Sequence, residues 1–294
     1  MDTSEIIKKV RKLEIKTKGL TKHIFSGEYH SAFKGRGMAF SEVRDYQYGD
    51  DVRNIDWNVT ARTGGTHVKI FEEERELTVM LLIDVSASSY FGTSTRFKSE
   101  MMTELAAVIA FSAITNHDKV GAILFSDRIE KYLPPKKGKQ NILRIIRELI
   151  HIQPKNQGTN LAEALVYLNN IEKKRSIAFV LSDFKAPDYE QALAIAAKKH
   201  DIIGIHIFDE REKSIPDVGL VQMTDAETGV KRLVDTSDIK VRQTWATYFK
   251  NQTARFQSIF NRAKCDTLSI DSQDDYIKAM QLFFKKEPKD ECKI

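Results

Sequence analysis

The chain has 294 residues, of which 41% are hydrophobic and 30% charged, and its formal net charge is +5 at pH 7. This composition is typical of a soluble globular protein with an ample core, and it excludes a disordered or collagen-like chain. A net charge this small does not by itself indicate nucleic-acid binding. The sequence contains only two cysteines, Cys265 and Cys292, which are too few for a disulfide framework and favour a reducing compartment.

No stretch of the sequence is typical of a membrane span or a secretory leader. The longest uncharged apolar run, residues 105–117, is shorter than the roughly 20 residues that a helix needs to cross a bilayer. Residues 1–5 lack the basic start and apolar core of a signal peptide. We therefore expect a cytoplasmic protein.

The first 33 residues are basic and have a helical pattern, since Ile6, Val10 and Leu13 fall on one face between lysines. A basic helix could contact nucleic acid or an anionic membrane. A helix that docks on its own domain with a solvated lysine face fits better, because the segment lacks an apolar face rich in Trp or Phe. We expect residues 1–76 to form this helix and a charged, aromatic segment, both packed on the core domain.

Residues 35–62 mix aromatic and charged side chains without a clear period, and residues 49–51 form a turn signal. One interpretation is a surface that meets a partner, with Arg44 and Arg53 as donors and Trp57 as an anchor. In the other, the arginines and aspartates of the segment form salt bridges that clamp it onto the core. A strand is expected next, over residues 67–76.

From residue 77 onward, short apolar runs alternate with segments of helical period. The runs are residues 77–83, 120–125, 177–181 and 202–208, and one of the helical faces combines Phe97, Met101, Leu105 and Val108. This alternation is typical of a parallel sheet covered on both faces. We predict an α/β, doubly wound, mostly parallel sheet over residues 77–294. Its C-terminal elaboration is a hairpin (219–223 and 230–234), a long helix (238–264), a strand (267–270) and a helix (274–284).

An aspartate follows each of the four apolar strands. These residues are Asp84, Asp127, Asp183 and Asp209. Ligands bind at the carboxyl edge of such sheets, and a carboxylate there is costly unless it is paired or hydrogen-bonded. Helix capping or loop formation is sufficient to explain Asp127 and Asp209, whereas Asp84 and Asp183 need a further explanation.

Three hydroxyls are expected at the same edge. Ser86 and Ser88 follow Asp84 directly, and Thr159 precedes a predicted helix. With Asp84 and Asp183 they form an all-oxygen set with few charges, which suits Mg²⁺ or Mn²⁺.

The order of these residues, D-x-S-x-S followed by a Thr and an Asp, resembles the metal-ion-dependent adhesion site of the von Willebrand factor type A domain. The resemblance implies that Ser86 and Ser88 ligate the metal directly and Thr159 directly or through water. Asp84 and Asp183 would act directly or through water, depending on the state. Neutral ligands leave the cation electrophilic, so that it takes a partner's carboxylate as its last ligand.

Residues 35–57 follow the pattern G-x-G-x-x-F-x-E-V-R-x-Y-x-x-G-D-D-x-R-x-I-D-W. This long run resembles the bacterial family called domain of unknown function 58. Residues 225–229 also resemble the family's hairpin, with Ala226 in place of its usual Pro. Many members are encoded beside MoxR-type AAA+ ATPases, which implies an adaptor role, and some relatives carry membrane segments.

Enzyme motifs are absent from the sequence. A haloacid-dehalogenase-like phosphatase needs a second carboxylate two residues after Asp84, where Ser86 stands. The sequence has no G-x-S-x-G elbow, H-E-x-x-H motif or Walker loop. The main hypothesis is therefore a non-catalytic protein-binding module that captures an acidic residue through a divalent cation. The alternative is a metal-dependent phosphoryl hydrolase that uses the same site.

Overall fold

The computed structural model describes residues 39–72, 77–92, 97–152, 154, 158–225 and 229–285. These residues divide into two compact units, which meet in the sequence at Leu77 and Thr78. The basic segment expected over residues 1–33 lies outside the described residues. Its packing on the core, and that of residues 34–76, stays a prediction.

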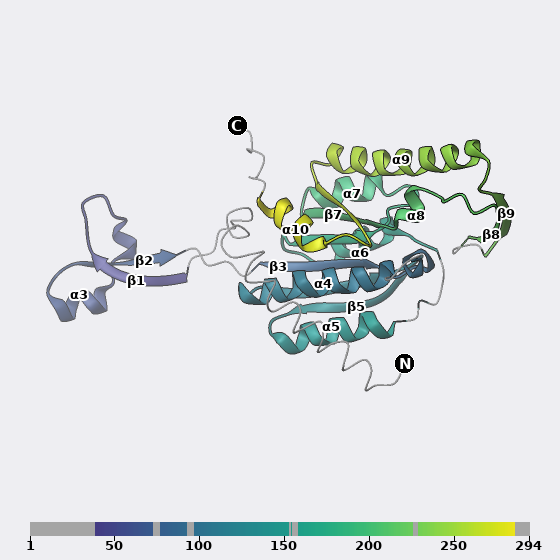
Figure 1. Cartoon of the computed structure of the whole chain (residues 1–294). Helices are drawn as coiled ribbons and strands as arrows, with labels where there is room; N and C mark the ends of the chain where they lie inside the picture. Colours follow the sequence, from purple (N-terminus) through teal and green to yellow (C-terminus); the bar gives the residue numbers. More distant parts are fainter. Residues whose placement is uncertain are drawn as a thin grey trace. The chain divides into compact units, whose positions relative to one another are not determined.

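The larger unit is built on a six-stranded sheet with the order β10-β7-β6-β3-β4-β5 (Figure 1). The strands are β3 (Thr78–Asp84), β4 (Lys119–Phe125), β5 (Ile129–Lys136), β6 (Ile177–Ser182), β7 (Asp201–Phe208) and β10 (Asp266–Asp271). Every neighbouring pair is parallel except β4 and β5. The predicted doubly wound, mostly parallel sheet is thereby confirmed.

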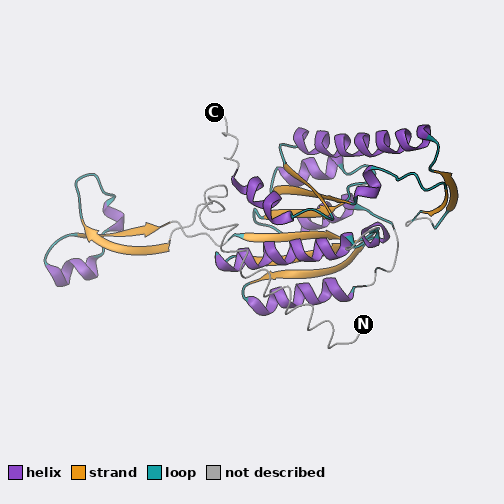
Figure 2. Ribbon diagram, in the orientation of Figure 1, coloured by secondary structure: helices purple, strands orange, loops and turns teal. Residues whose placement is uncertain are grey.

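Helices cover the sheet on both sides (Figure 2). They are α4 (Lys98–Thr115), α5 (Lys139–His151), α6 (Leu161–Ile171), α7 (Glu190–Ala197), α8 (Glu210–Lys213), α9 (Ile239–Arg262) and α10 (Tyr276–Lys285). Met80 and Leu82 of β3 pack in one core cluster with residues of α6, α7 and α9. Their neighbours Val79, Leu81 and Ile83 are also buried, so β3 is covered on both faces.

The C-terminal elements follow the sequence expectation closely. The hairpin consists of β8 (Leu220–Thr224) and β9 (Lys231–Asp235), and α9 begins after Asp238, whose side chain accepts a hydrogen bond from the Lys240 amide. Close packing of α9 on the sheet requires glycine at position 204 of β7. A Cβ atom there would lie 2.5 Å from the Phe260 ring.

Two features of the larger unit differ from the expectation. Strand β5 was not expected, because it contains Pro134 and Pro135, and proline disfavours a strand inside a sheet. The strand forms because it lies at the sheet edge, where proline is tolerated. The sequence pattern placed Phe97 on the buried face of α4, and this prediction was wrong. It is the N-cap residue of that helix and is 51% exposed, whereas Met101 and Leu105 are buried.

The smaller unit pairs β1 (Ala39–Asp45) with β2 (His67–Glu72) in an antiparallel ribbon. A turn of 3₁₀ helix, η1 (Val52–Asn54), and the helix α3 (Trp57–Thr63) lie between the strands in the chain. The Asp56 carboxylate caps α3 by accepting from the amides of Asn58 and Val59. Only β2 was expected from the sequence, as part of a strand over 67–76, and residues 73–76 lie outside the described residues.

Candidate metal-binding site at the carboxyl edge of the sheet

The direction in which strands are added to the sheet reverses between β3 and β6. From β3 the chain builds β4 and β5 on one side, and it then returns to place β6 and β7 on the other. In open α/β sheets, ligands bind outside the carboxyl ends of the strands where the order reverses in this way. Asp84 ends β3 and Asp183 directly follows β6, so the sequence prediction that they share an edge is confirmed.

Asp84 is 2% exposed and has neutral hydrogen-bond donors. Its Oδ1 accepts from the Ser86 amide at 3.0 Å, and its Oδ2 accepts from the Ser182 hydroxyl at 2.6 Å. Burial, together with the nearby charge of Asp183, raises the pKa of Asp84 to about 6. The site therefore contains a carboxylate that gains from an added cation.

The two serines of the D-x-S-x-S pattern lie together at the start of η2 (Ala87–Tyr90). The Oγ atoms of Ser86 and Ser88 are 3.1 Å apart, and the Ser89 hydroxyl fixes the turn by donating to the Ser86 carbonyl at 2.6 Å. Two adjacent ligands of an octahedral Mg²⁺, each about 2.1 Å from the ion, are about 3 Å apart. A direct hydrogen bond between hydroxyls has nearly the same length. The pair fits a divalent cation without rearrangement of its spacing.

Asp183 has a cationic partner that the sequence reasoning missed. The Lys98 amine, which is fully buried, lies 3.0 Å from Asp183 Oδ2 and 3.0 Å from Glu212 Oε1. Lys185 lies 2.6 Å from the same Glu212 oxygen and 3.9 Å from Asp183 Oδ2. Burial alone would raise the pKa of Asp183, but Lys98 and Lys185 hold it well below its usual range.

Lys98 keeps its charge in this environment. Burial would lower its pKa, yet Asp183 and Glu212 together raise it above the usual value. A signal for Lys98 was present in the sequence, because it precedes Met101, Met102 and Leu105 on one helical face. A lysine in such an apolar stripe needs a buried partner.

Thr159 lies at the neighbouring strand end. It is half-buried, and the amide of the next residue, Asn160, donates to the Ser126 carbonyl just after β4 at 2.7 Å. The Val85 amide in turn donates to the Phe125 carbonyl at 2.8 Å, which ties this region to the end of β3. The structure thus brings the Thr159 backbone to the predicted edge.

The two remaining aspartates have the structural roles that the sequence favoured. The Asp209 carboxylate caps α8 by accepting from the Arg211 amide at 2.9 Å. Asp127 accepts from Ser126 Oγ at 3.2 Å and from Arg128 Nε at 3.4 Å in the loop after β4. In the part of the chain that the structure describes, no group of three or more His, Cys, Asp or Glu side chains could hold a metal. A metal here would depend on the hydroxyls.

The three partner-binding candidates of the smaller unit differ in whether the side chain is already paired within the unit. Arg44 forms two hydrogen bonds with Asp50, at 2.7 and 2.9 Å, and Arg53 pairs with Asp51 at 2.9 Å. These pairs are local to the segment. Trp57 is 68% exposed and remains available as an anchor.

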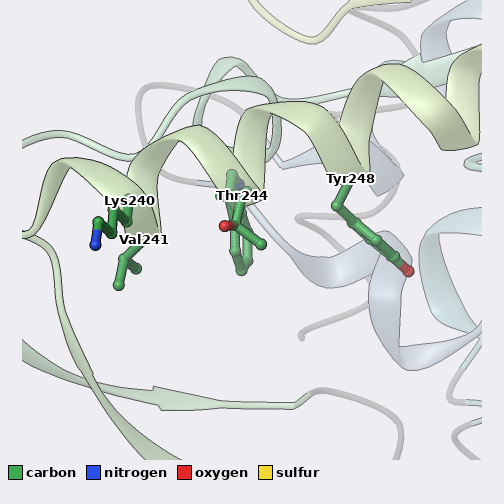
Figure 3. A pocket seen from close by; sticks show the side chains of 5 residues that line it. Lys240, Val241, Thr244 and Tyr248 are labelled. Carbon is green, nitrogen blue, oxygen red and sulfur yellow. The ribbon is translucent and has the colours of Figure 1, made fainter.

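Two hollows lie in the larger unit, and neither is lined by Ser86 or Ser88. One, of about 20 Å³, borders Asp84, Ser89 and Tyr90. The other, of about 430 Å³, is open and apolar and lies along α9, where Lys240, Val241, Thr244 and Tyr248 line it with Trp245 (Figure 3). Trp245 links this hollow to the edge, because its Nε1 donates to the Glu212 carbonyl at 2.8 Å.

A family model described as "Protein of unknown function DUF58" matches residues 42–255. The chain belongs to this family, which confirms the resemblance carried by residues 35–57. An uncharacterized protein of Mycobacterium tuberculosis is 33% identical over 235 residues, which are 79% of this chain and 74% of the relative. An uncharacterized protein of Mycobacterium avium is 27% identical over 156 residues, 52% of this chain and 92% of the relative.

Similar solved structures include an aerotolerance-related membrane protein from Bacteroides fragilis. It has a TM-score of 0.50 and 16% identity and covers 72% of this chain and 100% of its own, a likeness of fold alone. The VWA domain of SpRpn10 has a TM-score of 0.39 and 14% identity and covers 70% of this chain and 94% of its own. Within the described ranges, none of the helices of the present chain is both long and apolar enough to cross a membrane.

Proposed function

We propose that this protein is a non-catalytic protein-binding module that captures an acidic side chain of a partner through a bound divalent cation. Mg²⁺ or Mn²⁺ would be held by Ser86 and Ser88, with Asp84, Asp183 and Thr159 acting directly or through water. The observation that carries the proposal is the 3.1 Å separation of the two serine hydroxyls beside the buried Asp84 carboxylate. The cation would supply an electrophilic position for the partner's carboxylate.

Aromatic side chains beside the serines support a role in protein binding. Tyr90, Phe91 and Phe97 are 45%, 39% and 51% exposed. The Lys98 amide donates to the Phe91 carbonyl at 3.1 Å, which joins the start of α4 to the end of η2. Exposed aromatic residues next to a polar anchor are typical of interaction hot spots.

The proposed partner is a MoxR-type AAA+ ATPase, and the protein would act as its adaptor. This part of the proposal is supported by membership of the family, many of whose members are encoded beside such ATPases. Trp57, Arg44 and Arg53 of the smaller unit are a second proposed contact with the partner. We propose that the protein acts in the cytoplasm.

Metal binding is tested first by titrating the purified protein with Mn²⁺ in a calorimeter. The wild type should bind one ion, and the Ser86→Ala/Ser88→Ala variant should bind at least about tenfold more weakly, because two ligands are lost. Ser112→Ala is the matched control, since this buried hydroxyl has no hydrogen-bond partner among the described residues. Equal affinity in all three proteins would overturn the proposed ligand set.

Partner capture is tested with a purified MoxR-type ATPase immobilised on resin. The wild type should be retained in Mg²⁺ and released by EDTA, and the double serine variant should not be retained. Retention that ignores both EDTA and the serine changes would contradict a metal bridge. Turnover of a phosphate ester by the wild type, lost in Asp84→Asn, would instead support the alternative, a metal-dependent phosphoryl hydrolase.

A further inference from the structure

Five charged side chains meet at the carboxyl ends of β3 and β6, and four of them compensate one another. Lys98 lies 3.0 Å from both Asp183 and Glu212, and Lys185 lies 2.6 Å from Glu212. Two lysines thus face two carboxylates. The fifth group, Asp84, accepts hydrogen bonds from neutral donors, the Ser182 hydroxyl and Ser86.

The charge of the site follows from this pairing. With all five groups ionised, three carboxylates and two lysines leave one net negative charge. A divalent cation bound beside Asp84 would therefore remain with one uncompensated positive charge in a buried place, which is costly. An incoming carboxylate would cancel it.

We propose that Lys98, by neutralising Asp183 from within the core, makes the binding of a divalent cation at this edge depend on a carboxylate that the partner supplies. The inference rests on the proposed function and identifies the residue that regulates it. Metal and partner then bind with positive coupling, and each raises the affinity of the other.

Lys98 suits this role because it cannot withdraw when a metal arrives. Its side chain is fully buried, and its amine lies 6.0 Å from the centre of the Phe91 ring. Leaving Asp183 and Glu212 would strand an ammonium group without partners. The Lys185 side chain is 35% exposed, so its amine can turn to water. Lys98 is thus the fixed positive charge of the site.

The experiment measures the affinity for Mn²⁺ at neutral pH by the electron paramagnetic resonance of the free ion, with Mn²⁺ alone and with saturating acetate. Acetate should raise the affinity of the wild type at least about tenfold, because one negative charge is added a few ångströms from the ion. Lys98→Met should bind Mn²⁺ alone at least about tenfold more tightly than the wild type, and its gain from acetate should shrink.

Glu212→Gln makes the opposite change, and its amide oxygen can still accept the hydrogen bond from the Asp209 amide. This variant should bind Mn²⁺ alone about tenfold more weakly, with a larger gain from acetate. The double variant Lys98→Met/Glu212→Gln restores the formal charge of the site and should behave like the wild type. If Lys98→Met does not fold by circular dichroism, Glu212→Gln, which retains Lys98, still decides the question.

The outcomes separate this inference from the proposed function. If the wild type binds no Mn²⁺ even with acetate, the metal site itself is wrong. If the wild type binds Mn²⁺ but acetate and all the charge changes leave the affinity unaltered, the metal site stands and the role of Lys98 is overturned.

Discussion

Asp84 and Asp183 lie at the ends of neighbouring parallel strands, yet their environments differ in one respect. Asp84 is stabilised by a hydroxyl and an amide, whereas Asp183 is stabilised by the buried ammonium group of Lys98. The pKa of Asp84 is accordingly raised, by burial first, to about 6, and the pKa of Asp183 is lowered. The same strand geometry thus produces one carboxylate in need of a cation and one that already has it.

The largest effect is expected from removing the internal cation. Lys98→Met leaves Asp183 and Glu212 buried with only Lys185 beside them, and breaking a buried pair in this way costs about 3–5 kcal/mol. Urea denaturation should report a loss of this order in the free energy of unfolding. Lys250→Met, on the exposed side of α9, is the matched control and should change stability by less than about 0.5 kcal/mol. Equal stabilities would mean that Asp183 does not depend on Lys98.

The second effect is a dependence of stability on pH that arises from the raised pKa of Asp84. Because its pKa is raised from 3.8 to about 6 on folding, the folded state binds the proton more tightly. In the absence of metal, the contribution of Asp84 to the free energy of unfolding should therefore fall as the pH rises from 3.8 to about 6, by on the order of 2–3 kcal/mol.

Asp183 affects the free energy of unfolding in the opposite direction from Asp84, and it does so over a different range of pH. Its pKa is lowered on folding, so its stabilisation is complete above 3.8 and is lost as the pH falls below that value. Asp84→Asn isolates the first effect, because it removes one titrating group and retains an acceptor. The difference in unfolding free energy between the wild type and Asp84→Asn should change between pH 3.8 and about 6, and a flat difference would contradict the raised pKa.

A smaller effect is expected from Ser182, which donates a hydrogen bond to Asp84. Ser182→Ala removes the hydroxyl that donates to Asp84 Oδ2 and accepts from the Phe184 amide, at a cost of about 1–2 kcal/mol. The pKa of Asp84 should rise further, because this hydrogen bond lowers it. Thermal unfolding at several pH values measures both changes. Ser112→Ala should leave both unchanged.

The fold and half of this site were predictable from the sequence. Apolar strands of fixed length define a parallel sheet, and the position of Asp84 and Asp183 directly after two of them defines their common edge. The charge pairing was not predictable, because Lys98 lies 85 residues from Asp183 and 114 from Glu212 in the chain. A pattern around one aspartate carries no information about such distant partners.

The fold of the smaller unit was also predictable only in part. Asp56 and the segment before it carry the family pattern, but β1 lacks an alternation of apolar and polar residues and was missed. Its register with β2 is irregular between Phe40 and Glu42, which disturbs the period of two on which strand prediction depends. Whether Trp57 meets a partner stays a prediction.

The smallest effect concerns the backbone that presents Glu212 to Lys98. Trp245→Phe keeps most of the apolar contact of α9 but removes the Nε1 donor to the Glu212 carbonyl, and one such hydrogen bond contributes about 0.5–1.5 kcal/mol. Since α8 has only four residues, this bond helps to hold the carboxylate beside the ammonium group. The variant should lose stability within that range in urea. It should also shift the Mn²⁺ affinity in the same direction as Glu212→Gln but by a smaller factor, because the carboxylate is loosened and not removed. A shift larger than that of Glu212→Gln would show that Trp245 acts on the metal by another route, through the hollow along α9.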